Sequence, residues 1–155
     1  MSTSPVTALN ALTDLTALIG ERRGPSDWLQ IDQARVDAFA EATEDRQWIH
    51  LDVVRATAGP FGGPIAHGYL SVSLIPHLAA GLLTLEGFAA TINYGSNKVR
   101  FPMPLPVGTR VRGWSTLIDV AEHPLGLMVT QKVEIEAEGL SKPVCVAETL
   151  ALLVS

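Results

Sequence analysis

The segment from Ile65 to Leu83 contains no Asp, Glu, Lys or Arg. A helix on a protein surface keeps one polar face, so a helix without charged residues should be covered on nearly all sides. Pro76 should bend it. The chain must therefore fold into something that can surround a helix at about residues 67–83.

The chain changes character after about residue 89. Apolar and polar side chains alternate between Val129 and Ala137, and the stretches 110–119 and 144–154 follow the same pattern. Such alternation is typical of half-buried antiparallel strands with one wet face. We therefore predict strands mainly within residues 89–154.

Helices followed by antiparallel strands predict the α+β class. A chain of 155 residues fits one domain, 1–155. Ser4 and Pro5 suit the start of an N-terminal helix at about residues 5–19. An antiparallel sheet wrapped around the long central apolar helix, often called a hotdog fold, satisfies both patterns. Composition alone does not choose it over other α+β layers.

The composition narrows the partners and the compartment. A net charge of −5 argues against a broad basic surface for nucleic acid.

Cys145 is the only cysteine, so it forms no intramolecular disulfide, and its alternating context predicts a small core residue. Gly68, Pro76 and His77 interrupt the longest apolar stretch, so we expect no membrane span and a cytoplasmic protein.

Asp45 and His50 lie where a predicted helix gives way to a loop. A carboxylate and an imidazole at this spacing converge if the chain turns between them. Such a pair can hold one water and move its proton, which is general acid–base chemistry. A helix-end turn residue and a partly buried histidine would give the same pattern, so the spacing alone leaves both interpretations open.

A second motif leads from the loop at Gly62 into the central helix at Gly68. First-turn amides have no acceptor within a helix and lie at the positive end of its dipole. A glycine lets a ligand approach that amide, for example a thioester carbonyl that gains negative charge. Gly68 would equally permit tight packing between helix and sheet.

Together these two motifs resemble the MaoC-like (R)-specific enoyl-CoA hydratases, also called hydratase 2. Their motif is an Asp, a variable residue, Asn-Pro, an aliphatic residue and His. Asp45, Ile49 and His50 match it, whereas Gln47 replaces Asn and Trp48 replaces Pro. This variant is similar to a subgroup of single-domain hydratases from actinobacteria.

The resemblance extends from about residue 28 to the end of the chain. Its other matching segments are Pro64–Gly68, which resembles the opening of the family's central helix, and Asn97–Pro102 and Pro106–Gly108, which resemble its later strand and turn.

The resemblance implies a hydro-lyase for reversible syn hydration of trans-2-enoyl-CoA to (R)-3-hydroxyacyl-CoA. Asp45 and His50 would hold the water, and the Gly68 N–H would polarise the thioester carbonyl. Gln47 would orient the water or Asp45. Trp48 would either wall the substrate pocket or simply pack.

Phosphates of CoA would need local positive charge. Lys98 and Arg100 share one face of a predicted strand, and Arg110 and Arg112 share a face of the next. A solvated sheet face would explain either pair. We assign Lys98 and Arg100 to phosphate or the pocket rim.

The remaining histidines receive structural assignments. We expect His67 to make a hydrogen bond that fixes its loop, and His77 and His123 to be structural or exposed. The four histidines show no paired spacing, so we expect no metal site. No Gly-rich phosphate loop follows a strand, so we expect no cofactor beyond the CoA thioester substrate.

Two other functions remain open. A hotdog thioesterase commonly places a carboxylate on or beside the central helix, and residues 65–83 have none. A non-catalytic acyl-CoA or protein-binding module of the nodulation N type would not need Asp45 and His50. We expect a homodimer, since an open sheet leaves unpaired edges.

Overall fold

The computed structural model describes residues 6–8 and 10–155, so the predicted helix start at Ser4 and Pro5 lies outside the described residues. The elements, in chain order, are β1 (Val6–Thr7), α1 (Ala11–Ala17), β2 (Arg22–Arg23), β3 (Leu29–Gln30), α2 (Gln33–Thr43), α3 (Trp48–Leu51), α4 (Val53–Thr57), α5 (Gly68–Ser73), α6 (Ile75–Ala79), β4 (Leu85–Glu86), β5 (Ala90–Arg100), β6 (Arg110–His123), β7 (Gly126–Ala137) and β8 (Cys145–Val154).

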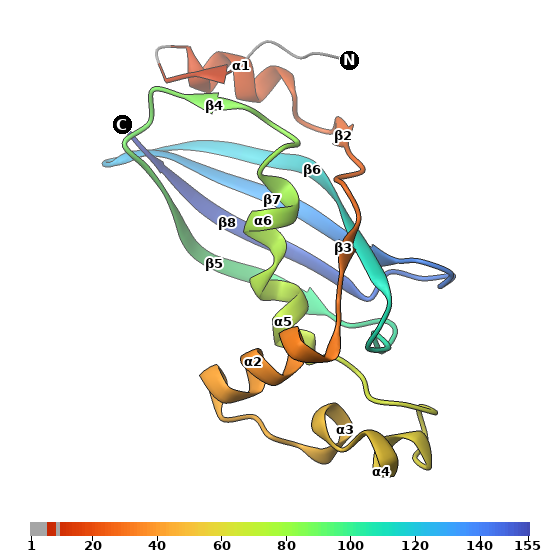
Figure 1. Ribbon diagram of the computed structural model, residues 1–155. Coiled ribbons are helices and arrows are strands. Elements are labelled where there is room, and N and C mark those ends of the chain that lie inside the picture. The colour runs from red at the N-terminus through yellow and green to blue at the C-terminus, as the bar shows by residue number, and fades with distance from the viewer. Residues whose placement is uncertain (1–5, 9) are drawn as a thin grey trace.

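One curved antiparallel sheet forms most of the molecule. Its strands follow the order β2-β6-β7-β8-β5, and β3 also pairs with β6. Helices α5 and α6 cross its concave face, while α2, α3 and α4 gather beyond one end of the sheet (Figure 1). The predicted α+β class and the hotdog arrangement are therefore confirmed.

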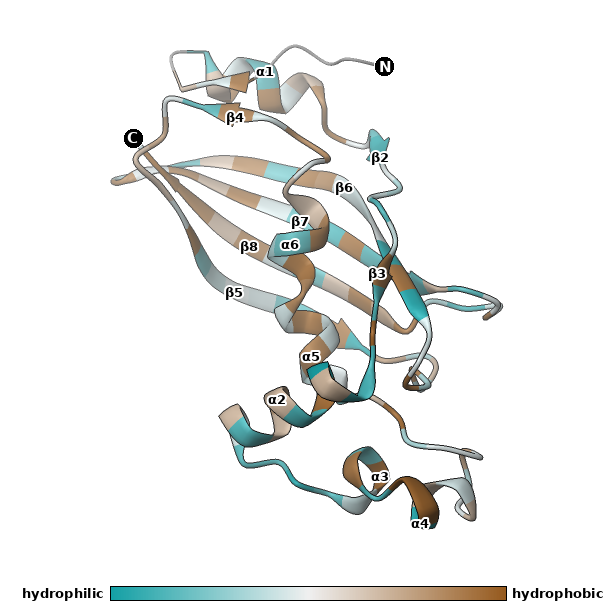
Figure 2. Cartoon of the chain, viewed as in Figure 1, coloured by the Kyte–Doolittle hydropathy of each residue, from teal (hydrophilic) through white to brown (hydrophobic). Residues whose placement is uncertain are grey.

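The core lies between the central helix and the sheet. Leu70, Ile75 and Leu78 of the helix belong to one buried cluster with inward-facing strand residues. Figure 2 shows hydrophobic residues along both the helix and the strands that it crosses. At Gly113 of β6 a Cβ atom would lie 3.0 Å from the Cβ of Leu78, so this glycine permits the close approach of α6.

The central helix differs from the predicted continuous helix over residues 67–83. It breaks at Leu74 into two short helices, and it ends at Ala79. Pro76 explains the break, because a proline has no N–H and its ring collides with the preceding turn. The chain then forms a turn, with the Leu82 N–H bonded to the Ala79 carbonyl at 3.0 Å, and Gly81 disfavours further helix.

The N-terminal helix is also shorter than predicted, because Val6 and Thr7 form a parallel strand with Leu85 and Glu86. The Val6 N–H donates to the Thr84 carbonyl at 2.9 Å, so this backbone is satisfied by β4 rather than by a helix. Helix α1 begins only at Ala11. Its residue Leu15 packs in a second core cluster at the far end of the sheet.

The outer face of the sheet carries paired charges. Arg110 pairs with Glu138, and Arg112 pairs with Glu136. For these two arginines the solvated sheet face is therefore the correct interpretation.

Cys145 is fully buried in the core, as its alternating context predicted, and burial raises the pKa of its thiol to about 11. Among the described residues, no helix has the length and apolar character needed to cross a membrane.

Candidate functional site

Three side chains from separate parts of the chain meet beside the start of the central helix. Asp45 lies in the loop between α2 and α3, His50 lies in α3, and His67 is the N-cap residue of α5. One carboxylate or ring-nitrogen atom from each of them lies within 4.8 Å of the others. The convergence of Asp45 and His50 that their spacing predicted is therefore present.

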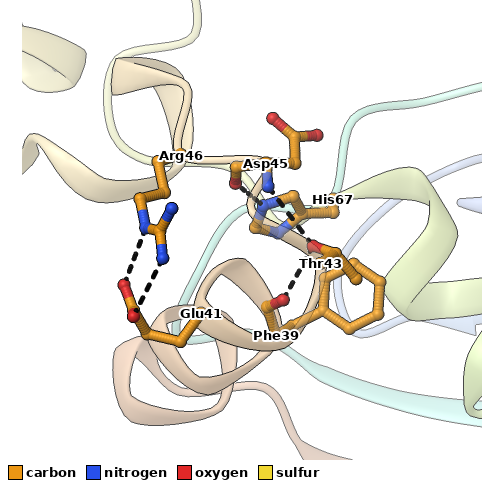
Figure 3. A network of polar contacts seen from close by, with 6 residues as sticks. All are labelled: Phe39, Glu41, Thr43, Asp45, Arg46 and His67. Carbon is orange, nitrogen blue, oxygen red and sulfur yellow. Dashed lines mark hydrogen bonds and ion pairs between the residues drawn. The ribbon is translucent and has the colours of Figure 1, made fainter.

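The end of α2 sets the direction of Asp45. The helix begins at the cap Asp32, whose carboxylate accepts from the Arg35 N–H at 2.9 Å. It ends at Thr43, and its C-cap residue Glu44 is a non-glycine residue with a left-handed φ of 62°. The Asp45 N–H then donates to Thr43 Oγ1 at 3.5 Å, and Arg46 makes two hydrogen bonds to the Glu41 carboxylate (Figure 3).

His50 is buried, and one of its ring nitrogens has a fixed role. Nδ1 lies 2.6 Å from the Ile65 carbonyl oxygen. A carbonyl only accepts, so Nδ1 carries the hydrogen, and Nε2 of the neutral ring keeps its lone pair. Burial is the largest influence on the pKa of His50 and lowers it, while the Asp45 carboxylate acts in the opposite direction. A neutral imidazole with a free Nε2 is suited to accept a proton.

The segment that anchors His50 is itself held on both sides. The Ile65 N–H donates to the Ile49 carbonyl at 3.0 Å, so two segments exchange hydrogen bonds at adjacent residues. On the other side, the Ala66 N–H donates to the Leu105 carbonyl at 2.8 Å. These contacts tie α3 to the turn that precedes β6.

Asp45 contributes an exposed carboxylate beside this buried ring. One water can hydrogen-bond to two groups when their atoms lie no more than about 5–6 Å apart. The separations within the cluster meet that requirement. The pair can therefore hold a water and exchange protons with it.

His67 makes the loop-fixing hydrogen bond that the sequence predicted, because its Nε2 lies 2.8 Å from the Asp45 carbonyl oxygen. Its place inside the cluster was missed. The ring stacks on His50 with centroids 3.8 Å apart and planes 24° apart. The only sequence signal was its position next to Gly68.

The stacking decides which ligand suits the cluster. The lone pairs of an imidazole lie in the plane of the ring. Two rings stacked in nearly parallel planes cannot both direct a lone pair at one ion. The geometry therefore suits a water and its protons better than a shared metal ion.

Gly68 is the first residue of α5, so its N–H has no acceptor within the helix. A Cβ atom there would lie 2.8 Å from the ring of Phe101. Close packing therefore requires a glycine here, as one of its two interpretations expected. The same contact places the end of β5 beside the start of the central helix.

Gln47 and Trp48 open α3. Gln47 is exposed, and its side chain makes no capping hydrogen bond. The guanidinium of Arg55 lies 4.1 Å from the centre of the Trp48 ring, and a Cβ atom at Gly59 would approach that ring to 3.2 Å. These contacts support the packing role of Trp48, which packs against α4 and the turn that follows α4.

Lys98 and Arg100 lie on β5, the edge strand that leads to Phe101. Both are exposed, and among the described residues neither forms an ion pair with a carboxylate. Their strand leads to Phe101, whose ring packs against Gly68.

A recess of about 220 Å³ lies elsewhere, between α1 and the turn joining β6 to β7. Its lining includes Asn10, Phe88 and Glu122 and none of the three clustered residues. The three clustered side chains therefore lie outside this recess.

Comparison with known proteins places these features in context. The family model described as "MaoC like domain" matches residues 14–138. The 3-hydroxyacyl-thioester dehydratase Z of Mycobacterium tuberculosis is 48% identical over 146 residues, covering 94% of this chain and 97% of the relative. Nodulation protein N of Rhizobium meliloti is 39% identical, covering 92% and 90% respectively.

The fold has counterparts among solved structures. The (R)-hydratase from A. caviae involved in PHA biosynthesis superposes with a TM-score of 0.71 at 27% identity. The match covers 87% of this chain and 96% of that one. The R-hydratase PhaJ1 from Pseudomonas aeruginosa gives 0.71 at 25% identity, covering 88% and 82%.

The electrostatics of His50 can be measured directly. We expect NMR titration to give a pKa below the ordinary histidine value, because burial disfavours the charged ring. Asp45→Asn should lower this pKa further, since the carboxylate that favours the charged form is gone. Asp27→Asn, an exposed change outside the cluster, should leave it unchanged. A rise of the pKa in Asp45→Asn would contradict the assigned geometry.

Proposed function

The chain belongs to the MaoC-like dehydratase family and is a hydro-lyase, and we propose that it catalyses reversible hydration of trans-2-enoyl-CoA to (R)-3-hydroxyacyl-CoA. The observation that carries this proposal is the meeting of the Asp45 carboxylate with a neutral His50 whose Nε2 is free. The relative named as a 3-hydroxyacyl-thioester dehydratase and the (R)-hydratase neighbour support this substrate class. The cytoplasmic location expected from the sequence stays a prediction.

The site would act on a water held between Asp45 and His50. The water oxygen bonds to C3, one of its protons passes to a base of the pair, and a proton is delivered to C2 on the same face. Because Nδ1 of His50 is bonded to Ile65, Nε2 is the nitrogen available for proton exchange. Asp45 supplies the other exchanging group.

The thioester carbonyl gains negative charge as the water oxygen bonds to C3 or, in the reverse direction, as a proton leaves C2. The Gly68 N–H, unbonded within its own helix, would stabilise that charge. Gln47 would orient the water or the carboxylate from the start of α3. This mechanism uses side chains, one amide and water, and requires no cofactor or metal.

The competing functions differ in their products. A thioesterase would release free CoA, and helices α5 and α6 contribute no carboxylate to the site. The similarity to nodulation protein N keeps a binding module as an alternative, because that name states no reaction. Binding of acyl-CoA without turnover would support the binding module.

Replacing either member of the pair tests the proposal. We expect Asp45→Asn and His50→Gln each to lower kcat by about 10²-fold or more, the usual scale for general acid–base groups. Loss of the conjugated enoyl-thioester absorbance would measure the rate with crotonyl-CoA, and chiral analysis should give the (R) product.

Asp27→Asn and His77→Gln serve as matched controls, because both positions are exposed and lie outside the cluster. Both should retain the activity of the parent protein. Formation of the (S) product, or full activity in folded Asp45 and His50 variants, would overturn the proposal.

We assign Lys98 and Arg100 to the phosphates of CoA, on the evidence of their exposure and their place on the strand that reaches Gly68. Arg100→Ala and Lys98→Ala should raise KM by about tenfold or less with little change in kcat, since a partly solvated charge contact contributes modestly. Lys142→Ala, an exposed lysine on a turn, is the matched control. An unchanged KM in the double variant, compared across salt concentrations, would refute the assignment.

We also propose a homodimer formed through β5. This edge strand is exposed along Ala90–Arg100 except for the half-buried Val99, and Ile92 and Tyr94 are large apolar residues that lie exposed on it. A long exposed edge favours pairing with another strand.

Light scattering should give twice the mass of one chain. Charged substitutions at Ile92 and Tyr94 should shift the protein toward the monomer. A monomer at the concentrations used for the activity assay would contradict this interface.

A further inference from the structure

We propose that His67 is a positioning residue that fixes the position of Asp45 relative to His50. The proposal rests on the proposed function, because it assumes that those two side chains carry the reaction. His67 itself is assigned no proton transfer. It acts through a main-chain contact on one side and a ring contact on the other.

The contacts of His67 join three helical segments. Its Nε2–H donates to the Asp45 carbonyl, in the loop after α2, at 2.8 Å. Its ring stacks on His50 of α3 at 3.8 Å, and the Phe39 ring of α2 lies 5.0 Å away on a tilted plane. Figure 3 shows the His67 ring beside the Asp45 main chain and above Phe39.

Burial and hydrogen bonding fix the state of this ring. His67 is only 3% exposed, and its Nδ1 is buried without a hydrogen-bond partner among the described residues. A carbonyl acceptor requires the hydrogen on Nε2, so the neutral ring leaves Nδ1 as the unfilled acceptor. His50 carries its hydrogen on the other nitrogen, Nδ1. The stacked pair thus consists of opposite tautomers.

The local hydrogen bonds explain why His67 matters for position. The Asp45 N–H is bonded to Thr43, and the neighbouring Arg46 is bonded to Glu41. Both partners belong to α2, so these bonds hold the loop only to the helix that precedes it. The bond from His67 ties Asp45 to the start of the central helix, where Gly68 lies. A shift of about 1 Å at a reacting group can cost about 10²-fold in rate.

Two substitutions separate the two contacts of His67. His67→Gln keeps an N–H donor but removes the ring, and His67→Phe keeps a ring to stack but removes the donor. We expect His67→Phe to lower kcat by about 10²-fold and His67→Gln by about tenfold or less, with KM within about threefold of the parent value. Phe39→Leu, which alters packing around His67 without touching the Asp45 hydrogen bond, should retain kcat within about threefold.

An NMR measurement tests the geometry independently of activity. Imidazole nitrogen shifts above neutral pH should show the hydrogen of His67 on Nε2 and that of His50 on Nδ1. In His67→Phe the protein should keep its urea midpoint, while the Asp45 amide signal shifts. Finding the His67 hydrogen on Nδ1 would overturn the proposal whether or not the protein hydrates enoyl-CoA.

The kinetic outcomes are equally decisive. A kcat equal to that of the parent protein in folded His67→Phe would overturn the positioning role. A lower kcat would also overturn it if the urea midpoint fell and KM rose by the same factor, because general destabilisation would then explain the loss. If the parent protein shows no hydration while the tautomers are as expected, the proposed function fails and the assigned contacts stand.

Discussion

The structure depends on the burial of a helix that has no charged face. The curved sheet covers one side of it, where Leu70, Ile75 and Leu78 are buried. The expected cover on nearly all sides is not met within the single chain, because Tyr69 is 73% exposed and Pro76 and His77 are also exposed. The close approach at Gly113, where the sheet meets Leu78, is one result of burial against the sheet. Another is the position of the helix start, where His67 and Gly68 come to lie against the loop after α2 and the end of β5.

Backbone carbonyls organise the site. The carbonyl of Ile65 fixes the ring of His50, and the carbonyl of Asp45 fixes the ring of His67. Both histidines are buried, so each needs its donor satisfied, and one carbonyl for each ring meets that need while leaving one nitrogen unprotonated. His50, one of the two side chains proposed for the reaction, is therefore oriented by main chain that the fold itself positions, and the main chain of the other, Asp45, is held by His67.

Much of this could be predicted from the sequence, because the relevant patterns are local. The uncharged segment and the alternating strands predicted the class and the wrapped sheet, and the spacing of Asp45 and His50 predicted their meeting. Contacts between distant segments left no local pattern. The parallel pairing of Val6 with Leu85 shortened the first helix, and Pro76 divided the central helix at Leu74.

The site shows the same limit. His67 was predicted to fix a loop, and it does, but its stacking on His50 depends on how two distant segments pack. Trp48 stands where the family usually has proline. The residues that pack against its ring, Arg55 and Gly59, follow later in the chain, so their contacts left no pattern beside Trp48. The spacing of Asp45 and His50 identified two members of the cluster, whereas the place of His67 and the orientation of all three depend on the fold.

The reciprocal bonds between residues 49–50 and residue 65 have a consequence for local opening. The Ile65 N–H is bonded to Ile49, and the Ile65 carbonyl is bonded to the ring of His50. Neither bond can break alone without leaving a polar group of the other segment unpaired. These segments should therefore open together as one cooperative unit. The rate of hydrogen exchange at the Ile65 amide then reports how often the hydrogen bond to the His50 ring is broken.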